Sequence, residues 1–120
     1  MKKTASLLFS IFLTISALNA QEKYTEFWQK VEKLEVDNLP KSALEIVEEI
    51  YAKAEKSGNS SQIIKTLFYK NKFALTLQED AQLKVINDFK NQISKANSPT
   101  KNVLENILAN LYWQYYQNNR

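Results

Sequence analysis

The sequence has no cysteine and no histidine, and it holds one glycine and two prolines in 120 residues. Without cysteine and histidine, a zinc centre of the usual kind cannot form, and neither can a Ser-His-Asp or Cys-His catalytic arrangement. One glycine cannot build a glycine-rich phosphate loop. We therefore expect a non-enzyme with no catalytic, cofactor-binding or metal-binding residue, and with no cofactor.

The chain also has no large excess of charge of one sign. The chain has 16 basic and 13 acidic residues, and residues 1–20 carry Lys2 and Lys3 but no acid. The remaining 14 basic residues exceed the acidic ones by one, and lysine and glutamate are interspersed over residues 22–56. A nucleic-acid-binding face would be a basic stripe, so no nucleic acid is expected as a partner. Carboxylate pairs such as Glu45 with Glu48, and the lysines Lys65 and Lys70, are interpreted as solvated helix faces.

The first twenty residues are typical of a secretory signal peptide. Lys2 and Lys3 precede an apolar stretch from Ala5 to Leu18, and Ala20 is a small residue suited to the position before a cut. The apolar stretch is shorter than the roughly 20 residues that span a bilayer comfortably. We expect cleavage before Gln21, and export to the periplasm or cell envelope.

Hydrophobic spacing after the signal peptide is helical. The first helix should end near Asn38, and the second should carry Pro40 in its first turn and stop at Ser57-Gly58-Asn59, where Gly58 suits a left-handed cap. The predicted apolar faces of these two helices are Tyr24, Phe27, Trp28, Val31 and Leu34, then Ala43, Val47, Ile50, Tyr51 and Ala54.

Three more helices are predicted. The third begins at Ser60 or Ser61, the fourth at about Glu79, and the fifth at Ser98-Pro99, with Ser98 as the N-cap and Pro99 as the first helical residue. Their predicted core residues are, in order, Ile64, Leu67, Phe68, Ala74 and Leu75; Leu83, Ile86, Phe89 and Ile93; and Leu104, Ile107, Leu108, Leu111, Tyr112 and Tyr115.

A weak internal repeat has an offset of 39 residues. It places Val47 on Ile86 and Ile50 on Phe89, and it aligns the turn at residues 58–61 with residues 97–100. Two consecutive helical hairpins produce such a pattern, which is the plan of an α-solenoid of the tetratricopeptide kind. We expect an all-α fold over residues 21–120, with about five antiparallel helices as stacked hairpins or as a small closed bundle.

Two of these helices carry aromatic residues away from their predicted core stripe. Tyr69 and Phe73 are four residues apart on the third helix, and Trp113 and Tyr116 lie off the stripe of the fifth. Exposed apolar patches often mark interaction sites, so these four residues form a candidate interaction surface. Aromatic rings also stack on sugars, so a carbohydrate-binding helical domain is an alternative.

The segment from Leu39 to Leu75, together with "LANLYWQYYQNNR" at residues 108–120, resembles the N-terminal helical region of exported α-2-macroglobulin-like proteins of Bacteroidetes-type bacteria. The resemblance implies a fragment of a longer protein in which β-sandwich domains follow a helical leader. It also implies protease trapping in the cell envelope. The partner would be the following domains or another envelope protein; a stand-alone periplasmic TPR-like module is the alternative. That family's thioester needs a cysteine, which this chain lacks.

Overall fold

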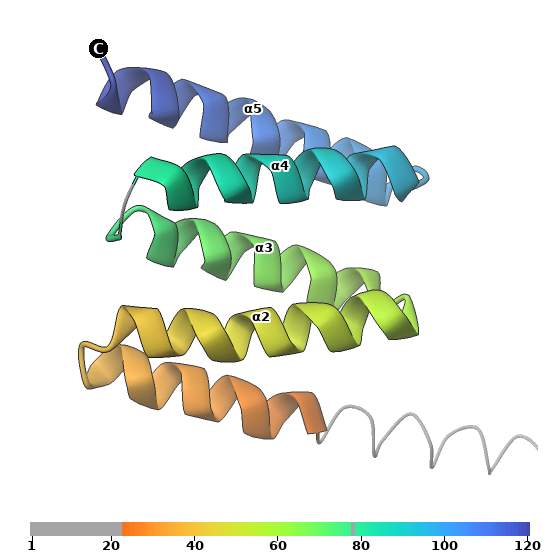
Figure 1. The fold of residues 1–120 in the computed structure, drawn as a ribbon. Helices are drawn as coiled ribbons and strands as arrows, with labels where there is room; N and C mark the ends of the chain where they lie inside the picture. The colour runs from red at the N-terminus through yellow and green to blue at the C-terminus, as the bar shows by residue number, and fades with distance from the viewer. Residues whose placement is uncertain (1–22, 78) are drawn as a thin grey trace, which may run out of the picture.

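The computed structural model describes residues 23–77 and 79–120, and in these residues it contains five helices and no strand. Residues 23–36 form the N-terminal helix; α2 (Pro40–Ser57), α3 (Ser60–Ala74), α4 (Glu79–Lys95) and α5 (Thr100–Asn118) follow (Figure 1). The predicted all-α fold is confirmed. The predicted signal peptide lies outside the described residues. Within the described part, no helix combines the length and apolar character needed to cross a membrane.

The first two connections are short left-handed caps. After the N-terminal helix, Asn38 has φ 55°, and the Leu39 N–H donates to the Leu34 carbonyl at 2.9 Å. After α2, Gly58 has φ 64°, and the next N–H, of Asn59, donates to the Ala54 carbonyl at 2.9 Å. Both patterns satisfy carbonyl groups that a helix end otherwise leaves unpaired. The predicted stops near Asn38 and at Gly58 are confirmed.

The predicted helix starts hold at three of the four positions tested. Pro40 is the first residue of α2, where its missing N–H costs nothing, and α3 and α4 begin at Ser60 and Glu79. The start of α5 is different: Pro99 itself occupies the cap position, and the helix begins at Thr100. The Ser98 hydroxyl bonds to the Asn102 side chain at 3.0 Å instead of capping a backbone N–H.

The helices stack in chain order (Figure 1), since α3 packs on α2, α4 on α3 and α5 on α4. Second neighbours also touch. On one layer, α2 and α4 are joined by the Glu48–Lys84 ion pair at 3.2 Å. On the other, the Trp28 ring of the N-terminal helix lies against the Tyr69 ring of α3, with centroids 4.8 Å apart. This order of contacts is that of a two-layer stack of helical hairpins, the arrangement typical of solenoids.

The buried core runs through all five helices. The predicted face of α2 is confirmed, because all five of its residues are buried. Four residues predicted in the core of later helices are exposed instead: Phe68, Leu75, Leu83 and Tyr112. Other residues that the sequence left out of the core are buried, namely Ile63, Thr66, Lys70 and Phe73 on α3 and Val85 on α4.

The internal repeat holds for the first helix of each hairpin and shifts in the second. The offset of 39 places buried Val47 and Ile50 on buried Ile86 and Phe89. In the second helices the buried residues instead follow an offset of 41, which places Ile63 on Leu104. The cause is the connection, because residues 58–59 join α2 to α3 whereas residues 96–99, two residues longer, join α4 to α5.

Candidate interaction surface

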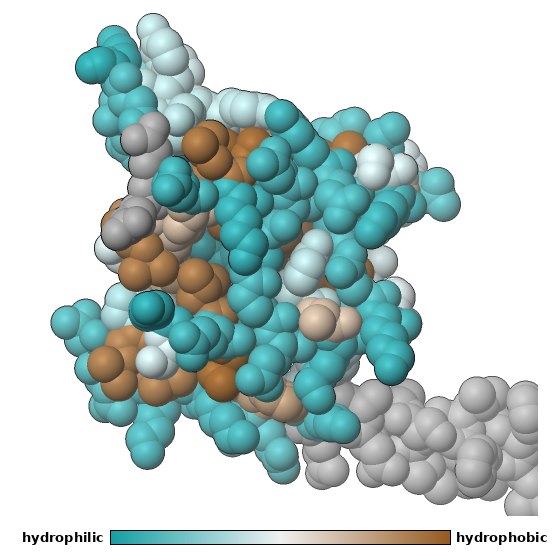
Figure 2. Space-filling model, viewed as in Figure 1, coloured by the Kyte–Doolittle hydropathy of each residue, from teal (hydrophilic) through white to brown (hydrophobic). Residues whose placement is uncertain are grey.

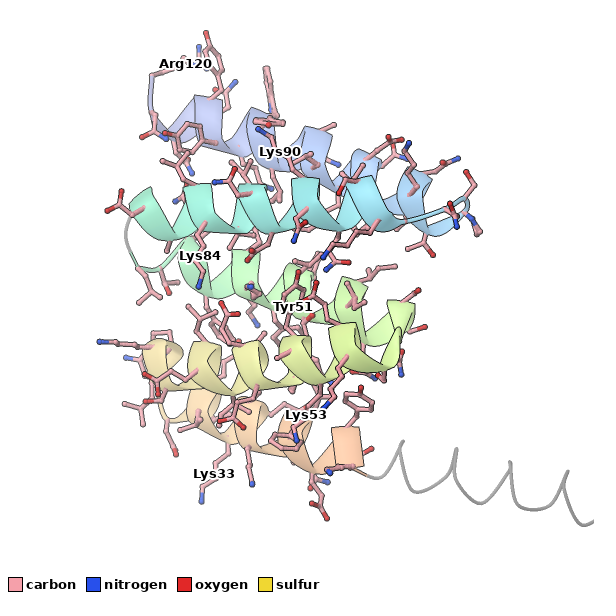
Figure 3. All side chains as sticks on the ribbon, turned by 45° about the vertical axis from the view of Figure 1, so that its right-hand side comes forward. Lys33, Tyr51, Lys53, Lys84, Lys90 and Arg120 are labelled. Carbon is pink, nitrogen blue, oxygen red and sulfur yellow. The ribbon has the colours of Figure 1, made fainter. Side chains whose placement is uncertain are left out.

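The two ends of the stack differ in chemical character. On the N-terminal helix, an exposed polar stripe follows positions i, i+3, i+4 and i+7, and Lys33 points away from the stack (Figure 3). On α5, an exposed stripe with the same spacing is apolar and aromatic. We call Ala109, Tyr112, Trp113 and Tyr116 the α5 stripe; the polar stripe is Glu26, Gln29, Lys30 and Lys33.

All three aromatic rings of the α5 stripe are exposed. Tyr112, Trp113 and Tyr116 are 43%, 64% and 59% exposed, and the Trp113 and Tyr116 ring centroids lie 6.3 Å apart. Cations border the stripe, with Lys90 Nζ 5.5 Å from the Tyr112 centroid and the Arg120 guanidinium 5.7 Å from the Tyr116 centroid. The stripe itself carries no charge, so it is suited to an apolar partner.

Helical geometry explains why the stripe is exposed. At 100° per residue, Trp113 lies opposite Leu104, which is buried in the core together with Leu111. The core face of α5 packs on α4, so its opposite face has no helix against it in the described chain. Tyr112 belongs to this surface, although the sequence placed it in the core.

The other two candidate residues are not part of an exposed surface, and their assignment is corrected. Phe73 is 3% exposed, and Tyr69 is partly buried against the core. The N-terminal helix covers them, because Trp28 lies on Tyr69 and the Glu35 carboxylate pairs with Lys72 beside them. This hydrogen bond to Glu35 raises the pKa of Lys72. The structure does not bring Tyr69 and Phe73 together with the α5 stripe.

A buried charge cluster joins three helices. Lys70 of α3 is 1% exposed, and its Nζ donates to Glu48 Oε2 of α2 at 2.9 Å and to Asp88 Oδ2 of α4 at 2.5 Å. The same Nζ lies 4.2 Å from the Tyr51 ring centroid. The solvated face predicted for Lys70 is therefore wrong. Its spacing from Ile63 and Leu67, at i+7 and i+3, places it on their face and was the available signal.

Tyr51 and Gln92 extend this cluster along the layer of α2 and α4. The Gln92 Nε2 donates to Tyr51 Oη at 2.7 Å and to Glu55 Oε1 at 2.6 Å. Burial raises the pKa of Tyr51; the hydrogen bond from Gln92 opposes this effect, and the Glu55, Asp88 and Glu48 carboxylates add to it. The contacts of the cluster link α2, α3 and α4 to one another.

Chemically, the two sets of residues have different uses. The charges of the cluster are paired with one another around buried Lys70, whereas the rings of the α5 stripe are exposed to solvent. In residues 23–77 and 79–120, no group of three or more carboxylates is placed to hold a metal ion. Comparison of the chain with protein-family models, with curated protein sequences and with solved structures finds no match.

Proposed function

We propose that this chain is a non-catalytic helical scaffold that docks through the α5 stripe onto the apolar face of a further helical hairpin. The observation that carries this proposal is the difference between the two ends of the stack. In repeat proteins the terminal units need a polar outer face. The N-terminal helix has such a face, and α5 has aromatic rings at the corresponding positions.

The helix pairs already present support this choice of occupant. Each hairpin buries its apolar face against the next one, as α3 does against α4. A helix laid on α5 would continue that arrangement. The rings of the stripe bury about 150–250 Å² each when fully covered, so about half of that remains to be gained at their exposure.

The resemblance to exported α-2-macroglobulin-like proteins suggests where the docked hairpin comes from. In this proposal the chain is exported after removal of residues 1–20, and the hairpin belongs to the following part of the same polypeptide or to another envelope protein. Protease trapping is the activity of the whole assembly, and the helical module contributes the docking surface. Mass spectrometry of the exported protein should show Gln21 as its first residue; retention of Met1 would contradict export by cleavage.

Site-specific photo-crosslinking in the source cell tests the docking. A photoreactive phenylalanine analogue at Trp113 should give one discrete product, and the crosslinked peptide should come from a helical apolar segment. The same analogue at Lys33, on the polar outer face at the other end, is the matched control. Equal crosslinking at the two positions, or a product spread over many unrelated proteins, would contradict the proposal.

A further inference from the structure

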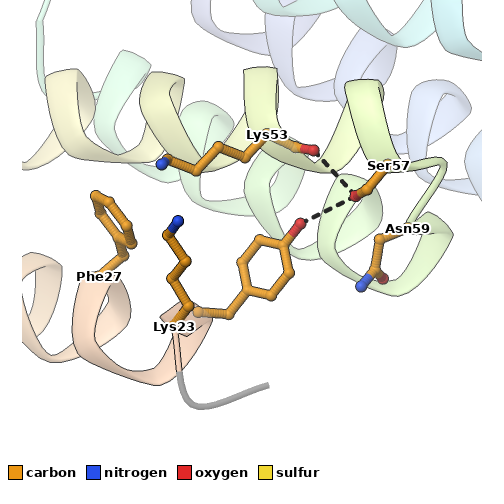
Figure 4. A pocket seen from close by; sticks show the side chains of 6 residues that line it. Lys23, Phe27, Lys53, Ser57 and Asn59 are labelled. Atoms are coloured by element: carbon orange, nitrogen blue, oxygen red, sulfur yellow. Dashed lines mark hydrogen bonds between the residues drawn. The ribbon is translucent and has the colours of Figure 1, made fainter. Parts of the chain in front are cut away.

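A second surface feature is a groove at the opposite end of the stack from the α5 stripe. It lies between the start of the N-terminal helix and the α2–α3 turn and has a volume of about 460 Å³ (Figure 4). This volume is within the range of small-molecule sites, about 300–1,000 Å³. We call it the N-terminal groove; its lining residues are Lys23, Tyr24, Phe27, Lys53, Ser57 and Asn59.

The charge in the N-terminal groove is of one sign. Lys23 reaches toward Phe27 from the N-terminal helix and Lys53 from α2 (Figure 4). Lys53 Nζ lies 4.7 Å from the Phe27 ring centroid, and Lys30 Nζ lies 5.4 Å from the same centroid. Among the residues that the structure describes, no carboxylate lines the groove. Lys23 and Lys53 both line the groove, so an anion bound between their two ammonium groups would be attracted by both.

The other wall of the groove is polar but largely occupied by its own bonds. The Ser57 hydroxyl donates to the Lys53 carbonyl at 3.0 Å, so the Tyr24 hydroxyl, 3.2 Å away, donates to Ser57 (Figure 4). Asn59 Oδ1 accepts from the Gln62 N–H at 3.2 Å, which leaves the side-chain NH₂ group of Asn59 as a donor. The six lining residues thus offer two cations, one amide donor and an aromatic ring, with no acceptor of matching strength among them.

We propose that the N-terminal groove binds an organic carboxylate that carries an apolar or aromatic group. The carboxylate would lie between Lys23 and Lys53, and the apolar group would lie against the Phe27 ring. The same chemistry occurs in a free aromatic acid and in a peptide that ends in phenylalanine with a free carboxylate. This inference is independent of the α5 stripe, which lies at the other end of the stack.

Nuclear magnetic resonance titration of the purified protein with phenylacetate tests the proposal. The expected result is a saturable shift confined to the backbone amides near Phe27, Lys53, Gly58 and Asn59, weakened by added salt. Benzylamine, of similar shape and opposite charge, should produce no such shift. Shifts of equal size with benzylamine would overturn the charge argument, and shifts scattered over the surface would overturn the site.

Two variants make the test specific. Lys53→Gln removes one cation that has no carboxylate partner among the described contacts, and it should weaken phenylacetate binding about fivefold, as expected for one unit charge at about 4 Å in water. Lys33→Gln removes the same charge outside the groove and should leave binding unchanged. Equal binding by both variants would overturn the proposal.

The source of the carboxylate is resolved with a short peptide ending in phenylalanine. If this peptide binds more tightly than phenylacetate and its amidated form does not bind, the ligand class is a chain end. If phenylacetate binds as tightly as the peptide, the class is a free aromatic acid. Binding of the amidated peptide with the same affinity would show that the carboxylate is not recognised, and would overturn the proposal.

Discussion

At the scale of single residues, Lys70 is the side chain whose environment departs furthest from its usual one. An ammonium group is seldom fully buried, and it is tolerated here because Glu48 and Asp88 accept from it. The two carboxylates come from helices on either side of α3, so the cation holds both neighbours. Removing one member of such a cluster leaves the others uncompensated, whereas removing the charges together does not.

Replacement of Lys70 by alanine should lower the free energy of unfolding by about 1.5–3 kcal/mol, because two partly buried carboxylates would lose the charged donor between them. The triple change Lys70→Met, Glu48→Gln and Asp88→Asn should cost much less, since the one charge that loses its partner is that of Lys84, which is exposed to solvent. Urea unfolding measures both. Lys95→Met, which breaks an exposed pair with Glu55 at 3.3 Å, should cost about 0–1 kcal/mol. An equal loss for Lys70→Ala and Lys95→Met would contradict the structural role of the cluster.

Tyr51 should make the fold sensitive to alkaline pH. Its pKa in the folded chain is raised above the ordinary 10.0, mainly by burial. Because this pKa is higher in the folded chain than in the unfolded chain, neutral Tyr51 contributes to the free energy of unfolding. The contribution is fully present below pH 10 and is lost as the pH rises through the pKa of the folded chain, since the unfolded chain releases the proton more readily. Absorbance titration of tyrosinate should show a late component. Tyr51→Phe should remove this component, and Tyr116→Phe, at an exposed site, should leave it in place.

At the scale of elements, the left-handed caps set where the first two helices end. Gly58 has open space where a side-chain methyl group would lie, with nothing within 4 Å, so a side chain there meets backbone strain and no clash. Gly58→Ala should therefore lower the free energy of unfolding by about 1–2 kcal/mol, the cost of a left-handed conformation for an ordinary residue. Gly58→Asn should cost less, because asparagine tolerates this conformation, as Asn38 does at φ 55°. Thermal unfolding of the two variants measures the difference, and equal losses would point to a steric cause instead.

How far the sequence predicted each element depends on whether its apolar residues lie on one side. In α2 they do, and the face from Ala43 to Ala54 was predicted without error. In α3 apolar residues come in adjacent pairs, Ile63 with Ile64 and Leu67 with Phe68, which point about 100° apart. Which member of each pair is buried depends on the neighbouring helices, and periodicity alone does not contain that information.

The candidate site was predictable in part for the same reason. Trp113 and Tyr116 lie away from the core face of α5, so their exposure followed from the helical repeat alone. Phe73 lies three residues after Lys70 on the buried stripe of α3, and it was misplaced because the predicted stripe ran through Ile64 and Phe68 instead. The spacing of Lys70 from Ile63 and Leu67 indicated its face of the helix, but its two carboxylate partners lie 22 residues before and 18 residues after it, which no local pattern shows.

At the scale of the whole molecule, the free energy of local opening should vary along the stack and should be lower at α5 than at α2. The N-terminal helix buries Tyr24, Trp28 and Val31, and the Trp28 indole N–H donates to Gln62 at 2.8 Å. In α5 the buried residues are Leu104 and Leu111, and its main contacts are with α4 alone. Native-state hydrogen exchange should therefore show amides of α5 opening at lower free energy than those of α2. Protection of α5 equal to that of α2 would contradict this order.

Because α5 is expected to open at low free energy, binding at its exposed stripe should change the stability of this helix. A ligand that binds only the folded form stabilises that form by mass action, so any partner seated on the stripe would also suppress the opening of α5. Because each helix passes its stability to the next in such stacks, the effect would extend inward through α4. A partner bound to the α5 stripe would then raise the free energy of unfolding of the whole stack, so that binding and folding would be thermodynamically coupled.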